Sequence, residues 1–212
     1  MRSFIGSIIS RKAAVAAALA ACALTAAGVA LAEEFSSQYT STAQQNCKKV
    51  KASKAVGDGD WSVNSCPGVA GLVVLLNEDD LRTTVSVGRT IGAAEKEKAA
   101  EQGYRPFNFV GDTLEWRSVK GAPRPFAIIQ RWMIADNENL DKNSRPISVP
   151  LLVVTRLAPG PMCHVAYIDG RANAEPNKLA RQAADENART FDCAGKPLVV
   201  GERGRAIELA LP

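Results

Sequence analysis

The sequence predicts a single α+β domain, built mainly from an antiparallel sheet with two helices and held together by two disulfides. Three observations predict it. Residues 1–32 have the pattern of an export signal, which leaves residues 33–212 for the fold. This part of the chain is long enough for one domain with a substantial core, and it contains four cysteines. Mostly consecutive strands joined by short turns, with helices between strand groups, are typical of the α+β class.

The first segment of the chain combines the three parts of a secretory signal peptide. Arg2, Arg11 and Lys12 carry positive charge, and an almost uninterrupted run of small apolar residues follows them. The run ends at Ala30-Leu31-Ala32, which fits the small-residue cleavage motif. We therefore expect a mature protein that begins at Glu33 and is periplasmic or secreted.

Two other interpretations of this segment stay open. The apolar run is about long enough to remain as a membrane anchor, but its richness in alanine suits an anchor poorly. Residues 19–22 resemble a bacterial lipobox, in which Cys22 would carry a lipid and make the chain an envelope lipoprotein. Against this, the residues after Cys22 stay apolar, whereas a lipoprotein usually has a polar tether there. No stable transmembrane span is expected after processing.

The charge of the mature chain argues against two classes of partner. The formal net charge of the whole chain is +4, but residues 1–32 hold three of the 26 basic residues and none of the 22 acidic ones. Residues 33–212 therefore carry 23 basic against 22 acidic side chains, a net charge of +1. Nucleic-acid binding needs a clustered basic face, so nucleic acid is not expected as a partner.

A charge near zero also gives little attraction for a cationic enzyme such as lysozyme, which a small exported inhibitor would bind.

The four cysteines of the mature chain predict two disulfides, because an even number in an exported chain favours pairing. Three pairings are formally open, and we favour Cys47 with Cys66 and Cys163 with Cys193. For the second pair, a strand of seven residues runs about 23 Å and the helix predicted after it about 22 Å. A helix that folds back over its strand brings Cys193 close to Cys163.

Cys163 stands directly before His164, the only histidine of the chain, and the pair raises the alternative of a thiol active site. A thiol nucleophile needs a free thiolate and a base placed beside it in space. Neighbouring side chains on a strand point to opposite faces, so adjacency in sequence does not place His164 beside the sulfur. We therefore expect a disulfide at Cys163 and a surface or hydrogen-bonded role for His164.

Strands are expected where short apolar or alternating runs are bounded by turn residues. A tight acidic connection at residues 78–80 predicts a hairpin, and residues 136–146 are expected to form a loop. Residues 33–46 are polar, and order is expected to begin near Tyr39. The expected strands are Trp61–Cys66, Gly71–Asn77, Leu81–Gly88, Phe107–Val119, Arg124–Ala135, Ser148–Leu157 and Cys163–Asp169, with short final strands at Leu198–Val200 and Ala206–Leu209.

Two segments predict helices. Ala93–Gly103 is rich in strong helix formers and ends in glycine, which predicts a solvent-facing helix. Asn177–Phe191 has helical apolar spacing that would place one face on the sheet.

Motifs for common enzyme chemistry are absent from the sequence. The chain has no H-E-x-x-H, no G-x-S-x-G, no Walker A loop and no G-x-G-x-x-G, and its cysteines lack zinc spacing, so no metal and no cofactor are expected. A hydrolase that uses two carboxylates remains an alternative, because two acids can meet from anywhere in a fold. Glu115 and Asp169, both on predicted strands, are its candidates.

A set of aromatic and charged residues on the predicted strands is the candidate binding face. Tryptophan, tyrosine and arginine are enriched in recognition surfaces, and the arginine fork suits carboxylate or phosphate groups. These residues would line one sheet face if the strand registers matched. The alternative is that the tryptophans are core and the arginines cover its rim. The set consists of Glu115, Trp116, Arg117, Arg131, Trp132, Arg156 and Tyr167.

Several segments together resemble short exported proteins of proteobacteria that have no assigned function. The segments are Cys47…Cys66-Pro67-Gly68, LRTTVSVGR, FNFVGDTLEWR, RPFAIIQRW, LLVVTRL and CHVAYID. The resemblance covers most of the mature chain and implies no activity, cofactor or functional residue.

The function expected from the sequence is that of an exported, disulfide-stabilised, non-catalytic domain. It would bind an envelope component or a small ligand through one sheet face. The alternatives are the carboxylate-dependent hydrolase and the envelope lipoprotein anchored through Cys22.

Overall fold

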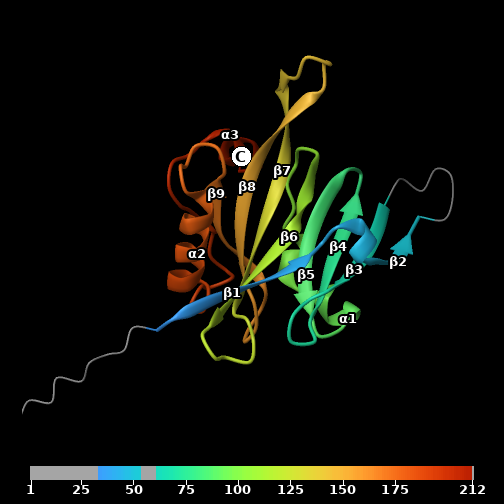
Figure 1. The fold of residues 1–212 in the computed structure, drawn as a ribbon. Coiled ribbons are helices and arrows are strands. Elements are labelled where there is room, and N and C mark those ends of the chain that lie inside the picture. Colours follow the sequence, from blue (N-terminus) through green and yellow to red (C-terminus); the bar gives the residue numbers. More distant parts are fainter. Residues whose placement is uncertain (1–32, 54–60, 212) are drawn as a thin grey trace, which may run out of the picture. The chain divides into compact units, whose positions relative to one another are not determined.

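The computed structural model describes residues 33–53 and 61–211, which fold into two sheets and three helices (Figure 1). The six-stranded sheet has the order β1-β6-β7-β8-β9-β10, and the four-stranded sheet has the order β2-β3-β4-β5. All neighbours are antiparallel except β9 and β10. The predicted signal peptide, its cleavage motif and Cys22 lie outside the described residues.

The bounds of the elements are as follows. The six-stranded sheet contains β1 (Phe35–Ser41), β6 (Asn108–Val119), β7 (Ala127–Leu140), β8 (Pro146–Arg156), β9 (Cys163–Asp169) and β10 (Leu198–Val199). The four-stranded sheet contains β2 (Lys48–Ala52), β3 (Trp61–Pro67), β4 (Val73–Asp79) and β5 (Arg82–Gly88). The helices are α1 (Ile91–Ala94), α2 (Pro176–Asn187) and α3 (Arg205–Ala210), with 3₁₀ turns η1 (Gln44–Asn46) and η2 (Lys98–Glu101).

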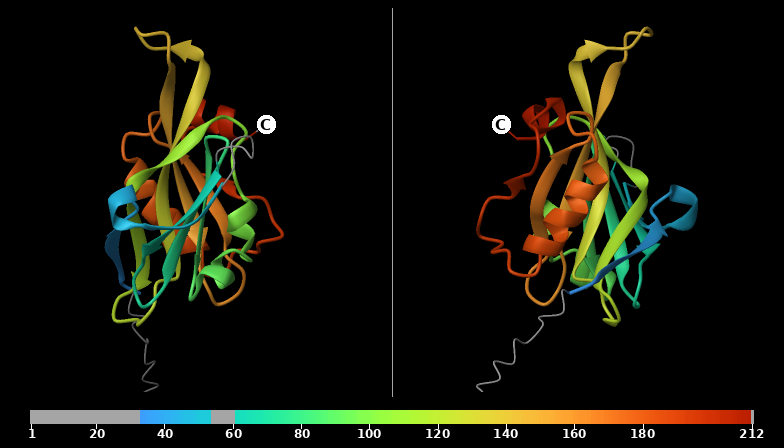
Figure 2. Two further views of the ribbon diagram at one scale, coloured as in Figure 1. Left: turned by 90° about the vertical axis from the view of Figure 1, so that its right-hand side faces the viewer. Right: turned by 60° about the vertical axis from the view of Figure 1, so that its left-hand side comes forward.

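The six-stranded sheet is covered on both faces, which explains why its central strands are apolar on both sides. One face packs against the four-stranded sheet and α3, through a core that includes Trp116, Trp132 and Ile207. The other face packs against α2, whose Ala183 and Ala184 lie in a second core cluster. Figures 1 and 2 show α2 on the opposite side of this sheet from β2 to β5. The predicted α+β fold, mainly antiparallel with two disulfides, is therefore confirmed.

Three predicted elements are corrected. Order was expected to begin near Tyr39, but residues 35–41 form β1, which pairs with β6 along its whole length. The helix predicted at 93–103 is replaced by the short α1 and the 3₁₀ turn η2. The final strand predicted at 206–209 lies instead in α3, because a carboxylate oxygen of Asp169 accepts the backbone N–H of Ala206 and caps this helix.

The loop predicted at residues 136–146 is instead the end of a long hairpin. Strands β7 and β8 remain paired as far as Leu140 and Pro146, beyond the neighbouring strands, and the hairpin projects in both views of Figure 2. At its base, the buried Asp136 carboxylate accepts two bonds of 2.8 Å from the Arg205 guanidinium of α3. Hydrogen bonds from Arg205 hold the pKa of Asp136 well below its usual range. At its tip, Asp141 accepts from the backbone of Asn143 and Arg145, which orders the turn.

No helix in the described part of the chain is long and apolar enough to cross a membrane.

Candidate functional site

Both predicted disulfides are present. Cys47 is bonded to Cys66 with a Cα–Cα distance of 4.2 Å, and Cys163 is bonded to Cys193 with a Cα–Cα distance of 5.8 Å. The second bond joins the start of β9 to the segment after α2, as expected for a helix that folds back along its strand. Two disulfides fit a protein of an oxidising compartment.

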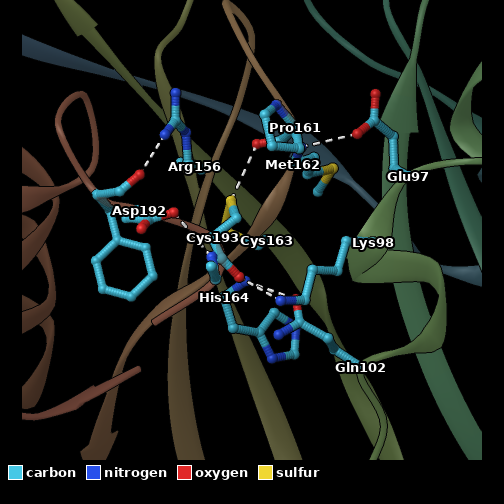
Figure 3. Close-up of a disulfide and its surroundings, with 12 residues drawn as sticks. Glu97, Lys98, Gln102, Arg156, Pro161, Met162, Cys163, His164, Asp192 and Cys193 are labelled. Atoms are coloured by element: carbon cyan, nitrogen blue, oxygen red, sulfur yellow. Dashed lines mark hydrogen bonds between the residues drawn. A yellow bond between two sulfur atoms is a disulfide. The ribbon is translucent and has the colours of Figure 1, made fainter. Parts of the chain in front are cut away.

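The surroundings of the Cys163–Cys193 bond give the sulfurs a structural role (Figure 3). Cys163 is 1 % exposed and Cys193 is 7 % exposed. Lys98 of η2 donates a hydrogen bond to the backbone carbonyl of Cys193. The side-chain oxygen of Gln102 accepts the backbone N–H of His164 at 2.8 Å. The disulfide therefore joins β9 to the segment after α2, at a place where both segments also contact η2. Because its sulfur is in this bond, Cys163 has no free thiolate.

The His164 side chain lies in an aromatic cluster. The imidazole ring is stacked with the ring of Tyr104 and lies edge-on to the rings of Trp132 and Tyr167. The distances between ring centroids are 5.6 to 6.2 Å. His164 Nδ1 is 2.9 Å from the Tyr167 hydroxyl, so the expectation of a hydrogen-bonded histidine holds, but it is buried and 1 % exposed. Burial lowers the pKa of His164 to about 3, and burial raises the pKa of Tyr167 to about 12. The ring is neutral at pH 7.

The seven residues of the predicted binding face do not share one face. Trp116, Trp132 and Tyr167 are buried in the core between the two sheets, as the alternative with core tryptophans predicts. The Trp116 indole N–H donates to Thr40 Oγ1 at 2.8 Å, which satisfies its polar atom inside the core. The strip expected from matching registers is therefore not formed.

The charged members of the set are held by other contacts. Arg117 donates to both carboxylate oxygens of Asp185 on α2, at 3.0 and 2.5 Å. Arg156 donates to the backbone carbonyls of Phe191 and Pro159, which ties β8 to two loops. Of the seven, only Glu115 and Arg131 line the same pocket.

The two carboxylates proposed for hydrolysis lie on opposite faces of the six-stranded sheet. Glu115 pairs across the strands with Ile129, which packs in the α2 core, whereas Asp169 pairs with Leu151, which packs in the core between the sheets. Asp169 also accepts three backbone N–H groups, from Arg171, Ala172 and Ala206, each at 2.8 Å. The two groups cannot act on one bond.

A pocket on the α2 side of the sheet, here called the α2 pocket, is the candidate site. Its volume is about 380 Å³. The floor is apolar, formed by Ile129 of β7 and Leu152 of β8, both nearly fully buried. The complete lining is Tyr39, Gly111, Asp112, Thr113, Glu115, Ile129, Arg131, Leu152, Asn177 and Arg181.

A bulge in β6 forms one wall of the α2 pocket. Val110 pairs with Trp132 and Leu114 with Gln130, so three residues of β6 stand opposite a single residue of β7. The carbonyl of Gly111 in the bulge accepts from Thr42 Oγ1 at 2.8 Å and from Gln130 Nε2 at 2.6 Å. These bonds fix the bulge, which places Asp112 at the rim of the pocket.

The charges around the α2 pocket differ in whether they are paired. Glu115 accepts from Ser37 Oγ at 2.5 Å and from Arg181 Nε at 2.7 Å, and the hydrogen bond that Arg181 donates to Glu115 raises the pKa of Arg181. The half-buried Arg131 donates only to the neutral side chain of Asn177, at 3.2 Å. Within the described ranges, Arg131 and Asp112 have no ion-pair partner. The pocket thus presents one unneutralised cation and one unneutralised anion.

Sequence reasoning identified Arg131 and Glu115 but missed Asp112, Asn177 and Arg181. Gly111 inside a strand pattern is a signal for a bulge, yet it does not tell which side chain the bulge exposes. Asn177 and Arg181 lie on α2, and no local pattern distinguishes them from other polar residues of an amphipathic helix.

In the described residues, no three His, Cys, Asp or Glu side chains meet in a group that could hold a metal ion. Comparison of the chain with family models, curated proteins and solved structures finds no match.

Proposed function

We propose that this protein is an exported, non-catalytic binding domain, periplasmic or secreted, that holds a small zwitterion with an apolar side chain in the α2 pocket. A free apolar amino acid is the simplest ligand of this class. The observation that carries the proposal is the pair Arg131 and Asp112, which line one pocket without neutralising partners above the apolar floor of Ile129 and Leu152.

The chemistry of the α2 pocket matches the three parts of such a ligand. The Arg131 guanidinium suits a carboxylate, because its planar fork donates two parallel hydrogen bonds. The Asp112 carboxylate suits an ammonium group. The aliphatic floor takes an apolar side chain, as in ligand pockets where a few polar groups orient a mostly apolar contact. Glu115 and Asp169 lie on opposite faces of the sheet, and Cys163 is oxidised, which supports binding over the two-carboxylate and thiol chemistries considered from the sequence.

The binding test uses L-leucine and two analogues that each lack one charge. In isothermal titration calorimetry, the disulfide-bonded protein is expected to bind L-leucine more tightly than leucinamide, which lacks the carboxylate, and N-acetyl-L-leucine, which lacks the ammonium group. Arg131→Gln should weaken L-leucine binding at least tenfold, because a hydrogen bond to a charged group is lost. Asp112→Asn should also weaken L-leucine binding.

Arg203→Gln is the matched control, because Arg203 is an exposed arginine that does not line the α2 pocket. This variant should bind L-leucine as the wild type does. Equal affinity for L-leucine and both analogues, or no binding of L-leucine, would overturn the proposal.

Export has its own test. Residues 1–32 have the signal pattern, and disulfides persist in oxidising compartments. Mass spectrometry of the unreduced protein, recovered from the periplasm or medium of a bacterial host, should give a chain that begins at Glu33 and lacks four thiol hydrogens. A fatty-acylated chain that begins at Cys22 would support the lipoprotein alternative instead.

A further inference from the structure

A second pocket lies where the chain leaves β5, approaches β7 and leaves β8, and it is separate from the α2 pocket. We call it the apolar pocket, and its volume is about 200 Å³. Most of its lining is apolar, and its three charged residues are Arg89, Glu97 and Arg124. The complete lining is Leu72, Val87, Gly88, Arg89, Ala93, Glu97, Arg124, Pro125, Leu157, Ala158 and Met162.

The apolar pocket reaches the core between the sheets. Val87, Leu157 and Met162 are 5 %, 6 % and 1 % exposed, so they form its interior wall. Met162 is held at two points. Its backbone N–H donates to Glu97 Oε2 at 2.8 Å, as Figure 3 shows, and its sulfur accepts the backbone N–H of Val87 at 3.1 Å. The apolar wall is therefore preformed, and a ligand that enters would not have to order it.

The charged residues of the apolar pocket favour an anion. Arg89 and Arg124 are exposed, and in the described part of the chain neither makes an ion pair or a side-chain hydrogen bond. Glu97 is the one opposing charge in the lining, and one of its oxygens is engaged by Met162. The two guanidinium groups leave a net positive charge beside an aliphatic cavity.

We propose that the apolar pocket binds a medium-chain carboxylate, a free fatty acid with a short tail. The tail lies against Val87, Leu157 and Met162, and the carboxylate is bound by Arg89 and Arg124. Paired guanidinium donors suit a carboxylate. An aliphatic cavity of about 150 Å³ holds benzene, so this cavity accommodates a chain of about six to eight carbons. This site does not depend on the α2 pocket or on its ligand.

The test compares ligands that differ in tail length or head group. Titration calorimetry with butyrate, hexanoate and octanoate should show an affinity that rises about fourfold with each methylene buried. Octanol and octylamine have the same tail as octanoate but lack its negative charge, and both should bind at least tenfold more weakly than octanoate.

Variants separate the head-group contact from the tail contact. The double variant Arg89→Gln/Arg124→Gln should lower octanoate affinity to that of octanol. Glu97→Gln should raise octanoate affinity, because it removes the opposing charge and keeps an oxygen that can accept from Met162. Ala93→Phe, a change at an exposed residue of the pocket, should block octanoate, whereas the matched change Ala174→Phe at an exposed residue outside this lining should not.

The results with octanoate test this proposal independently of whether L-leucine binds in the α2 pocket. Octanoate binding that survives in both the double arginine variant and Ala93→Phe would overturn it. Equal binding of octanoate and octanol, or no octanoate binding by the folded wild type, would also overturn it. Near-ultraviolet circular dichroism of each variant shows that a loss of binding is not a loss of fold.

Discussion

Replacing Cys163 and Cys193 together by alanine is expected to lower the free energy of unfolding by about 3.5 kcal/mol in urea denaturation without reductant. The bond closes a loop in which the cysteines are 30 residues apart, and a cross-link of this length restricts the unfolded chain by about that amount. The effect is a large fraction of the stability of an ordinary domain. It should appear as a lower urea midpoint with a larger dependence on denaturant, because the unfolded state of the variant is more expanded.

The other disulfide provides the comparison. Cys47 and Cys66 are 19 residues apart, so the double variant Cys47→Ala/Cys66→Ala should lose about 3 kcal/mol, slightly less than the first. If the Cys163/Cys193 variant keeps its stability to within about 1 kcal/mol, the bond is not a structural brace.

Lowering the pH from 7 to 5 is expected to reduce the free energy of unfolding by about 2 kcal/mol through His164 alone. The folded-state pKa of His164 is about 3, against 6.5 for the unfolded chain. Below pH 6.5 the unfolded chain binds a proton at this ring and the folded protein does not, so stability falls as the pH falls until it reaches the folded pKa. His164 is the only histidine of the chain, which makes this window specific to it.

The measurement is a series of urea unfolding curves between pH 7 and pH 5 for the wild type and for His164→Phe. The observable is the change in the free energy of unfolding between pH 7 and pH 5, which does not depend on the absolute stability of the variant. This loss should be smaller in the variant by about 2 kcal/mol. Tyr167→Phe is the control. It removes the hydrogen-bond partner of His164 Nδ1 but keeps the buried ring, so the slope should persist. Equal slopes for wild type and His164→Phe would show that His164 is accessible to protons in the folded protein.

The strands that are buried on both faces were the most predictable part of the fold. The bounds predicted for β9, Cys163–Asp169, agree with the structure, because an alternating run of strand length ends at a glycine there. The same strand and the helix after it predicted the Cys163–Cys193 bond from lengths alone. In these segments local pattern and tertiary burial favour the same structure.

The elements that were missed depend on contacts that are distant in sequence. The polar residues after Asp136 predict a loop, but they continue as paired strands because the backbone ladder and the turn at Asp141 do not need an apolar face. Helix α3 begins where Asp169 caps Ala206, which lies 37 residues further along the chain. Neither contact leaves a local pattern in the sequence.

The candidate site was predicted only in part for the same reason. Arg131 could be predicted because arginine is enriched in recognition surfaces. Its role in the pocket depends on the bulge at Gly111, which exposes Asp112, and on α2, which supplies Arg181. The alternation of a regular strand does not predict a three-residue bulge, so the partner charges could not be assigned.

The hairpin of β7 and β8 also has a consequence for the solubility of the protein. In the described residues, the part of β7 after Ala135 and the part of β8 before Pro150 pair with each other but with no further strand. The backbone groups on their outer edges are therefore free, and such edges can pair with strands of other molecules. Glu138 lies on this part of β7, and Asp141, Lys142 and Arg145 lie in the turn that joins β7 to β8. Their charges disfavour the addition of a further strand. Neutral replacements at these positions would favour end-to-end aggregation of native molecules through the hairpin.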